Sequence, residues 1–277
     1  MSKPLRVGWH REHFLSPLLQ FAAEDKGETF ELVECPGGTG EMQVKMKEGE
    51  IDVCIALTDA LIAGLANGQT AAIITGKDSQ YNSVSDLKGT TFGISRLGSG
   101  SQVMASVLAM NEGWTEADVP KFKVNGQFKP LRDSVNAGET SVFLWEWFTT
   151  KPFVDSGEVR FIGSVYTPWP SWSFAATPST SSSQISQFLK SLQPFVTRFN
   201  SAEARAKDDI DFVVENFGQQ RADVEEWIQT VRWEERMSEV DESVVRETLR
   251  VLTKAGVVKE GEWDMDLFVR SDVATLV

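Results

Sequence analysis

The stretch GISRLGSGSQ (93–102) combines glycines and hydroxyl side chains at the point where a strand-like run gives way to a helical pattern. Gly98 and Gly100 are followed by Val103, so the third glycine of a dinucleotide-binding loop is missing, and no Gly-Lys-Ser/Thr of a P-loop follows. The stretch therefore does not predict a nucleotide site. What remains is a helix start, whose free amides and dipole favour an anion.

Several side chains in this stretch suit a phosphate, a sulfonate or a carboxylate. Ser95, Ser99 and Ser101 offer hydroxyl groups beside the first amides of the expected helix, and Arg96 offers a counter-charge. The alternative is that Ser99 or Ser101 simply caps its own helix. The sequence leaves both interpretations open.

Two other strand-to-helix junctions have the same character. In CPGGTGE (35–41), Gly38 permits close approach of the backbone and Thr39 adds a hydroxyl, although a tight turn would need the same residues. Thr58 follows the apolar run DVCIAL at the N-cap of a helix expected near 58–67. If these helix starts face one ligand, they predict a common anion site.

An acidic residue interrupts the aromatic run FLWEWF (143–148). A carboxylate at Glu146 needs a partner, which is a cationic or amino group of a ligand, a protein arginine, or water. Trp145 beside it, like Trp169 and Trp172 in the segment YTPWPSWSFAAT, is a candidate stacking face or a core side chain.

The chain has only two histidines, His10 and His13, on either side of Glu12 in HREH. They lack the i, i+4 spacing of a zincin helix, so we predict no metal site, and His13 and Glu12 are instead candidates for polar contacts to a ligand. No G-x-S-x-G motif is present. We therefore predict no catalytic residue and no cofactor.

The elements that position these residues follow from the hydrophobic pattern. Short strand-like runs near 5–9, 29–34, 51–57 and 70–75 alternate with helical patterns, and a second series follows at 90–95, 121–125, 141–147 and 159–164. Helices are expected near 183–199, 201–217, 220–231 and 241–255. This order predicts α/β lobes with mainly parallel sheets, in which ligands bind beyond the carboxyl ends of strands.

Composition narrows the function further. A net charge of −13 is unfavourable for binding a nucleic-acid backbone. The two cysteines do not suggest a disulfide framework, and no apolar run has the length of a membrane span or a secretory signal. These observations predict a cytoplasmic protein with no membrane insertion and a small-molecule partner.

An ordered set of segments resembles the type II periplasmic-binding-protein superfamily. The segments are LRVGW, VECPGGTGEM, EGEIDVCIALTDALIAGLANG, VSDLKGTTFGISRLGSGSQVM and FLWEWFTTKPFVDSGEVRFIG. They are most similar to the branch of aliphatic-sulfonate-binding and thiamine-pyrimidine-synthase-like proteins, which includes fungal cytosolic members.

The resemblance implies an α/β fold with two lobes, a hinge and a central ligand cleft. Lobe one would comprise 1–76 plus 172–277, and lobe two 77–171. The loops at 10–14, 37–40, 58–59, 95–101 and 145–146 would surround the cleft. The expected ligand contacts are Glu12, His13, Gly38, Thr39, Thr58, Ser95, Arg96, Ser99, Ser101, Trp145 and Glu146.

The sequence departs from both characterised roles of that branch. The lack of a signal peptide or anchor cysteine argues against an ABC permease as partner, and Cys35 and Cys54 do not form the cysteine-rich motif of the pyrimidine synthases. We therefore expect a hinged clamp that binds a small polar or anionic metabolite (sulfonate, phosphate or pyrimidine/thiamine precursor). The alternatives are an enzyme of thiamine-pyrimidine precursor biosynthesis and the solute-binding component of an importer.

Overall fold

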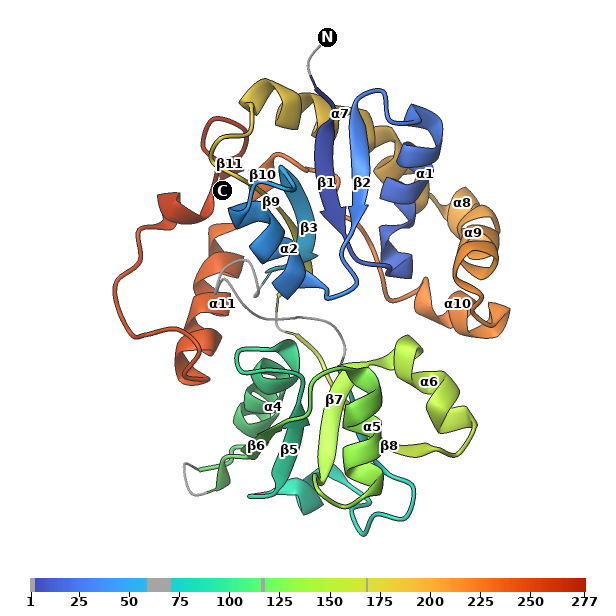
Figure 1. Ribbon diagram of the computed structural model, residues 1–277, viewed down its shortest axis with the longest axis vertical. Coiled ribbons are helices and arrows are strands. Elements are labelled where there is room, and N and C mark those ends of the chain that lie inside the picture. Colours follow the sequence, from blue (N-terminus) through green and yellow to red (C-terminus); the bar gives the residue numbers. More distant parts are fainter. Residues whose placement is uncertain (1–2, 59–70, 116–117, 168) are drawn as a thin grey trace. The chain divides into compact units, whose positions relative to one another are not determined.

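The computed structural model describes residues 3–58, 71–115, 118–167 and 169–277. The chain divides into two compact units (Figure 1). Unit 1 comprises Met1–Ala56, Phe174–Glu242 and Asp264–Val277, and unit 2 comprises Leu57–Ser173 and Ser243–Trp263. Apart from Thr58, the helix predicted near 58–67 lies outside the described residues.

Unit 1 is built on a four-stranded sheet in the order β2-β1-β3-β9. Its strands are β1 (Leu5–Trp9), β2 (Phe30–Glu34), β3 (Val53–Leu57) and β9 (Trp172–Ala176). The central strand β1 runs parallel to both neighbours, with Val7 opposite Leu32 on β2 and opposite Val53 on β3. The carboxyl ends of β1, β2 and β3 therefore lie at one edge of this sheet.

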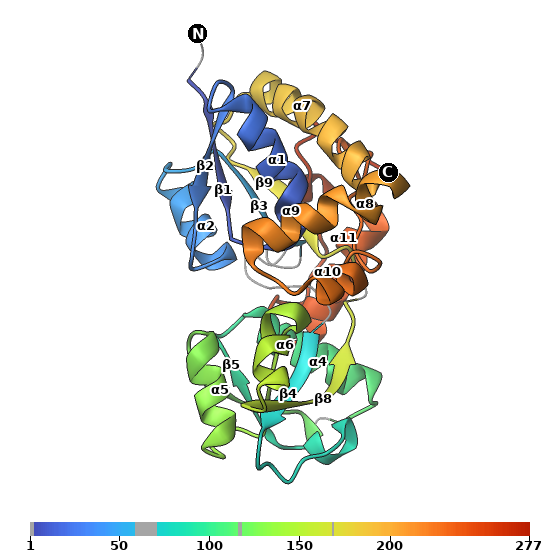
Figure 2. The ribbon, with the colours of Figure 1, turned by 90° about the vertical axis from the view of Figure 1, so that its right-hand side faces the viewer.

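Helices cover both faces of this sheet, with α2 on one face and α1 and α7 on the other (Figure 2). The helical elements of unit 1 are η1 (His13–Leu15), α1 (Ser16–Asp25), α2 (Thr39–Lys47), α7 (Ser182–Asn200), α8 (Ala202–Ala206), α9 (Asp208–Phe217), α10 (Arg221–Trp227) and η4 (Met265–Phe268). The aromatic ring of Phe30 on β2 joins α1 to α7, because its centroid lies 4.7 Å from that of Phe21 and 5.1 Å from that of Phe188. These ring contacts belong to the hydrophobic core of unit 1.

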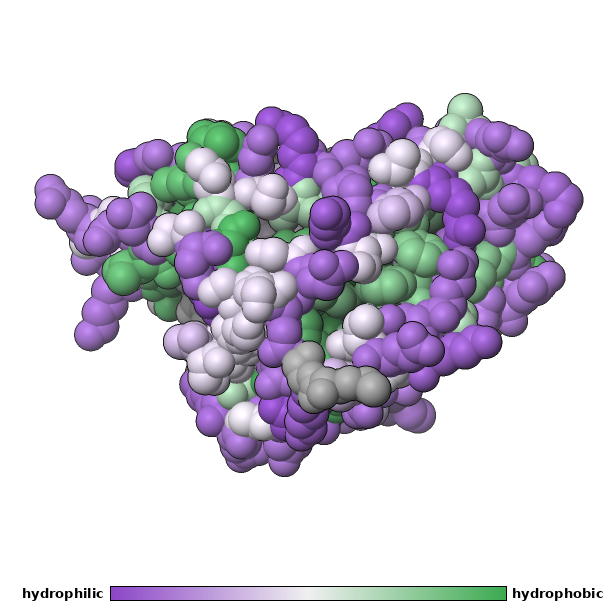
Figure 3. Space-filling view, turned by 90° about the horizontal axis from the view of Figure 1, so that it is seen from above, coloured by the Kyte–Doolittle hydropathy of each residue, from purple (hydrophilic) through white to green (hydrophobic). Residues whose placement is uncertain are grey.

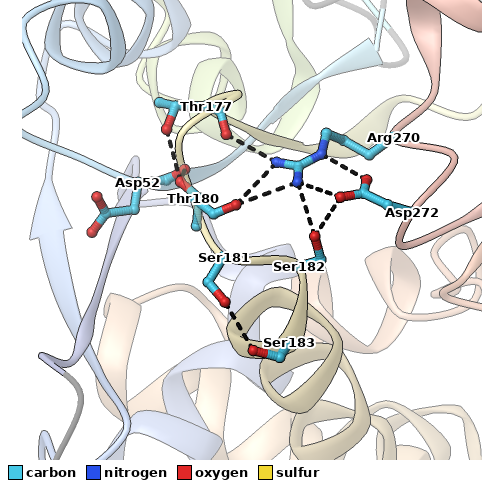
Figure 4. A network of polar contacts seen from close by, with 8 residues as sticks. All are labelled: Asp52, Thr177, Thr180, Ser181, Ser182, Ser183, Arg270 and Asp272. Carbon is cyan, nitrogen blue, oxygen red and sulfur yellow. Dashed lines mark hydrogen bonds and ion pairs between the residues drawn. The ribbon is translucent and has the colours of Figure 1, made fainter.

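The C-terminal segment is bound to the start of α7 by one arginine (Figure 4). The Arg270 guanidinium donates to the carbonyl oxygens of Thr177 and Thr180 at 3.0 and 3.3 Å, and it pairs with Asp272 at 2.8 Å. Asp272 in turn accepts a hydrogen bond from Ser182 in the first turn of α7. A short parallel pair, β10 (Glu239–Val240) with β11 (Thr275–Leu276), completes this attachment.

Unit 2 is built on a five-stranded sheet in the order β6-β5-β7-β4-β8. The strands are β4 (Ala71–Gly76), β5 (Thr91–Ile94), β6 (Lys121–Val124), β7 (Val142–Glu146) and β8 (Val159–Val165). β5 is parallel to β6 and β7, whereas β4 is antiparallel to both β7 and β8. The sheet is therefore mixed, and β4 is the one strand in it that runs against the others.

Alternate residues of these strands form two separate cores. Ile73, Phe92 and Leu144 pack with α4 (Gly100–Asn111) and α11 (Glu242–Lys254). Ala72, Ile74 and Phe143 point the other way, into the core that includes residues of α5 (Phe128–Asn136), against which residues of α6 (Trp147–Asp155) also pack. The period-2 alternation of side chains in each strand thus produces a three-layer α/β unit. The short helix η2 (Val84–Leu87) adds Leu87 to the α4 core.

The described structure confirms the α/β class and the predicted strands to within two residues. It also contains elements that were not predicted, among them strand β9 of the unit 1 sheet. Helix α6 was not expected, and the helix predicted over 201–217 is interrupted at Lys207. The division between units also differs from the predicted boundaries of 76/77 and 171/172. β4 joins unit 2 because it pairs with β7 and β8, and α11 joins it because Val251 and Leu252 pack in the α4 core.

The face shown in Figure 3 is largely hydrophilic, with apolar residues in separate patches. Among the described residues, no helix is long and apolar enough to cross a membrane.

Candidate functional site

The sheet of unit 2 brings the ends of β5, β6, β7 and β8 to one edge. Ala71, the first residue of the antiparallel strand β4, is opposite Glu146 at the end of β7 and opposite Val165 at the end of β8. β5 is parallel to β7, with Gly93 opposite Phe143, so its end lies at the same edge. The loops that follow β5, β7 and β8 therefore leave the sheet together, as expected for a ligand-binding edge of an α/β sheet.

A tight turn joins β5 to α4. The amide of Ser99 donates to the carbonyl oxygen of Arg96 at 3.1 Å, and Gly98 has a φ of 69°, which favours glycine at the third position of such a turn. The Gly98 amide donates to Oε1 of Gln102 at 2.7 Å. Leu97 at the tip is 71% exposed. The glycine at 98 is thus required by the turn itself.

The donor groups at the start of α4 are buried and have no hydrogen-bond acceptor among the described residues. Ser99 and Ser101 are 1% and 6% exposed. Ser99 is the N-cap, but its hydroxyl makes no capping hydrogen bond, and its Oγ has no hydrogen-bond partner among the described residues. The amides of Gly100 and Ser101 precede the first i−4 carbonyl of the helix, and no acceptor for them is found in the described part of the chain. Ser99 therefore does not act as the simple cap that was the alternative interpretation.

Arg96 adds a positive charge to the same turn. The side chain is partly buried, and burial lowers the pKa of its guanidinium, which nevertheless stays protonated in proteins. Ser95 before it is also partly buried. The β5–α4 turn thus joins a charged donor, a hydroxyl and free amides within six residues, all suited to an oxyanion.

Glu146 caps helix α6 at this edge. Its Oε1 accepts from the Phe148 amide at 3.0 Å and its Oε2 from the Thr149 amide at 2.6 Å. Burial raises the pKa of the carboxyl group, while these two amides lower it. Trp145 stacks on Phe128 with ring centroids 5.2 Å apart. The acceptors that Glu146 was predicted to offer a ligand are therefore directed at its own helix, and Trp145 is directed at the α5 core.

Thr58 has protein partners in unit 2. Its amide donates to the carbonyl oxygen of Ser171 at 2.9 Å, and its Oγ1 lies 2.7 Å from Oγ of Ser173. The side chain is 3% exposed. These contacts hold the end of β3 to the segment that enters β9.

In unit 1, the loops after β1 and β2 contact each other. The Cys35 amide donates to the carbonyl oxygen of Trp9 at 2.7 Å, and Nδ1 of His10 lies 3.0 Å from the carbonyl oxygen of Cys35. Glu12 is partly buried, with Oε1 4.0 Å from Nε2 of His10.

His13 lies within the packing of unit 1. It is 4% exposed, its ring meets Trp227 of α10 edge-on at 4.4 Å, and its Nδ1 lies 3.2 Å from Nε2 of Gln219. Burial lowers the pKa of the imidazole to about 4, so the ring is neutral at physiological pH.

The start of α2 has an acidic group of its own. Gly38 is the N-cap, with a φ of 67°, and Thr39, the first residue of the helix, is 6% exposed. Oε2 of Glu41 in the first turn accepts from the Gly37 amide at 2.7 Å, and Glu41 also pairs with Lys45 at 3.4 Å. A carboxylate already favoured by the helix dipole makes this helix start less suited to a second anion than that of α4.

Two residues at this edge of the unit 2 sheet were not among the predicted ligand contacts. Oδ1 of Asn125, just after β6, and Nε1 of Trp169, after β8, are buried without a hydrogen-bond partner in the described chain, as is Oγ of Ser99. All the described side chains of unit 2 with such atoms follow strands whose ends meet at this edge. Trp169 was visible in the sequence only as a stacking face or core residue, and Asn125 carried no signal.

Within the residues that the structure describes, no group of three or more His, Cys, Asp or Glu side chains is placed to hold a metal ion.

Comparison with known proteins supports this architecture. A family model described as Ca3427-like PBP matches residues 71–165. The Candida albicans CA3427 gene product, described as defining a new family with the generic periplasmic-binding-protein fold, is 28% identical over 98% of this chain and 96% of its own, with a TM-score of 0.84. The chain has the type II periplasmic-binding-protein fold. The predicted resemblance and fold class are thereby confirmed.

Other proteins with this binding-protein fold are more distant in sequence. The alkanesulfonate-binding protein SsuA of Xanthomonas axonopodis pv. citri, bound to MOPS, is 16% identical over 94% of this chain and 95% of its own, with a TM-score of 0.67. The ligand-binding component of an ABC-type import system of Staphylococcus aureus, with zinc bound, is 10% identical over 99% and 97%, with a TM-score of 0.72. A search of curated proteins found no match.

Proposed function

We propose that this protein binds a small metabolite that carries an oxyanion, and that the start of α4 in unit 2 holds the anionic group. The proposal gives the chain the role of a hinged clamp that binds its ligand without chemical conversion. Ser99, Ser101 and the amides of the first turn of α4 are the donors, and Arg96 supplies the charge.

The observation that supports the proposal most is the buried, acceptor-free start of α4. An unpaired buried donor costs about 1–3 kcal/mol, so such groups are rare in native proteins. Here the Ser99 hydroxyl and the amides of Gly100 and Ser101 occur together at a helix N-terminus, where the dipole adds to the attraction for negative charge. An oxyanion would satisfy all of these donors.

The other helix starts make weaker candidates. The amides at the start of α6 donate to Glu146, and the start of α2 already holds the Glu41 carboxylate. The proposal therefore places the anion at α4 and does not require the other two.

The test is direct binding by isothermal titration calorimetry, in a Tris buffer free of sulfonates and phosphates. The probes are MOPS, ethanesulfonate, inorganic phosphate and a short carboxylate, with a neutral alcohol of similar size as the negative control. Ser99→Ala should weaken binding of the probe about 10- to 150-fold, because hydrogen bonds to charged groups contribute about 1.5–3 kcal/mol. The same substitution should leave the stability of the free protein unchanged or raise it, because it removes an unpaired hydroxyl.

Ser181→Ala is the matched control. Ser181 is the N-cap of α7 in unit 1, also makes no capping hydrogen bond to its helix, and is exposed. The Ser181→Ala variant should bind the probe with the same affinity as the wild type. Equal affinities of Ser99→Ala and the wild type, or no binding of any oxyanion, would overturn the proposal.

A further inference from the structure

The crossover segment after β8 contains a second buried donor without a partner. Trp169 is 4% exposed, and its indole Nε1 has no hydrogen-bond acceptor among the described residues. Indole N–H groups usually find a partner when they are buried. An N–H that lacks one is therefore a candidate contact for a group that is absent from the free chain.

The position of the Trp169 ring is fixed by its packing. It belongs to the buried hydrophobic cluster that also contains Ala71 of β4, Val165 of β8 and Leu252 of α11. The hydroxyl of Thr167 donates to the carbonyl oxygen of Trp169 at 3.0 Å. A rigidly packed donor of this kind can bind an acceptor at little entropic cost.

The hydrophobic cluster that contains Trp169 also contains residues from the first turns of α4. Val103 and Met104 of that helix belong to the same cluster, so the indole lies on the α4 face of the sheet. The ends of β5 and β8, from which Ser99 and Trp169 follow, lie at the same edge. The two unpaired groups thus share a face and an edge of one sheet.

We propose that Trp169 is a ligand-binding residue whose indole N–H donates to the molecule held at the start of α4. This inference rests on the proposed function. Because an indole N–H only donates, and the amides of α4 only donate, the ligand must present acceptor lone pairs to both groups. A sulfonate or phosphate group, with three or more terminal oxygens, meets that requirement more fully than a single carbonyl.

The test is the indole N–H spectrum of the ¹⁵N-labelled protein, which contains nine tryptophans. Trp169→Phe identifies the Trp169 signal by its loss. Addition of MOPS or inorganic phosphate should shift that signal, and Trp169→Phe should weaken binding of the same probe about tenfold or more. Because phenylalanine fills less of the core than tryptophan, this substitution should also lower the melting temperature of the free protein.

Trp233→Phe is the matched control, because its indole already has a protein partner. Nε1 of Trp233 in unit 1 donates to the carbonyl oxygen of Phe14 at 2.9 Å. This substitution should lower the melting temperature and leave affinity for the probe unchanged.

The outcomes separate the two proposals. If a probe binds in a Ser99-dependent way but the Trp169 signal does not shift, or Trp169→Phe binds as well as the wild type, the role of Trp169 is wrong and the anion site stands. If none of the oxyanion probes binds, both proposals are wrong.

Discussion

Replacing Asp209 by asparagine should change the pH dependence of stability in a predictable direction. Asp209 lies in the first turn of α9 and is 1% exposed, and neither of its carboxylate oxygens has a hydrogen-bond partner in the described chain. The Gln20 amide and the guanidinium groups of Arg198 and Arg205 lower its pKa, but none of them meets hydrogen-bond geometry. Arg205 instead donates to the carbonyl oxygens of Val231 and Ile228.

Burial raises the pKa of Asp209 from 3.8 to about 6. Between about pH 4 and 6, the native carboxyl group keeps a proton that the unfolded one has lost, so the native state binds more protons. The free energy of unfolding therefore falls as the pH rises through this window. A pKa difference of about 2 corresponds to a loss of about 3 kcal/mol, complete above pH 6.

Asp209→Asn cannot ionise, so its stability relative to the wild type should rise by about 3 kcal/mol from pH 4 to pH 7.5. Urea unfolding followed by tryptophan fluorescence at both pH values measures this difference. Asp208→Asn is the matched control, because Asp208 is an exposed neighbour in the same turn and should show little change. If the stability difference between Asp209→Asn and the wild type is the same at both pH values, the carboxyl group has similar pKa values in both states and the reasoning is wrong.

Two further predictions concern residues expected to contact a ligand. Glu146→Ala should lower the urea-derived stability of the protein by about 0.5–2 kcal/mol, because it removes the cap of α6; unchanged stability with lost binding of the oxyanion probe would instead favour the ligand contact first predicted. Burial lowers the pKa of His13 from 6.5 to about 4, so between these pH values the native imidazole stays neutral while the unfolded one binds a proton. The free energy of unfolding should therefore fall by about 3 kcal/mol as the pH drops from 6.5 to 4. An NMR titration of the His13 Cε1 proton should show no midpoint above pH 5, and a midpoint near 6.5 would contradict the buried, neutral ring.

The hydrophobic pattern predicted the secondary structure well because it depends on local periodicity. β1 and β7 occur where alternating or apolar runs indicated strands, and α4 begins within a residue of the position given by its serines and glycines. Helix α6 was missed because its aromatic start reads as a continuation of the strand, and the cap that begins it is the side chain of Glu146, whose role depends on where the strand ends.

The sequence by itself determined the α/β class and the family resemblance. It also predicted the 95–101 loop as a candidate anion site, because glycine, serine and arginine at a strand-to-helix junction suit an oxyanion. Only the tertiary structure decided that the start of α4, unlike those of α2 and α6, lacks an acceptor, because this depends on the Glu41 and Glu146 side chains turning back to their own helices. It also decided the roles of residues far apart in the chain. Burial and pairing arise from contacts between distant segments, which is why the unpaired hydroxyl of Ser99 and indole of Trp169 became evident only in the folded chain.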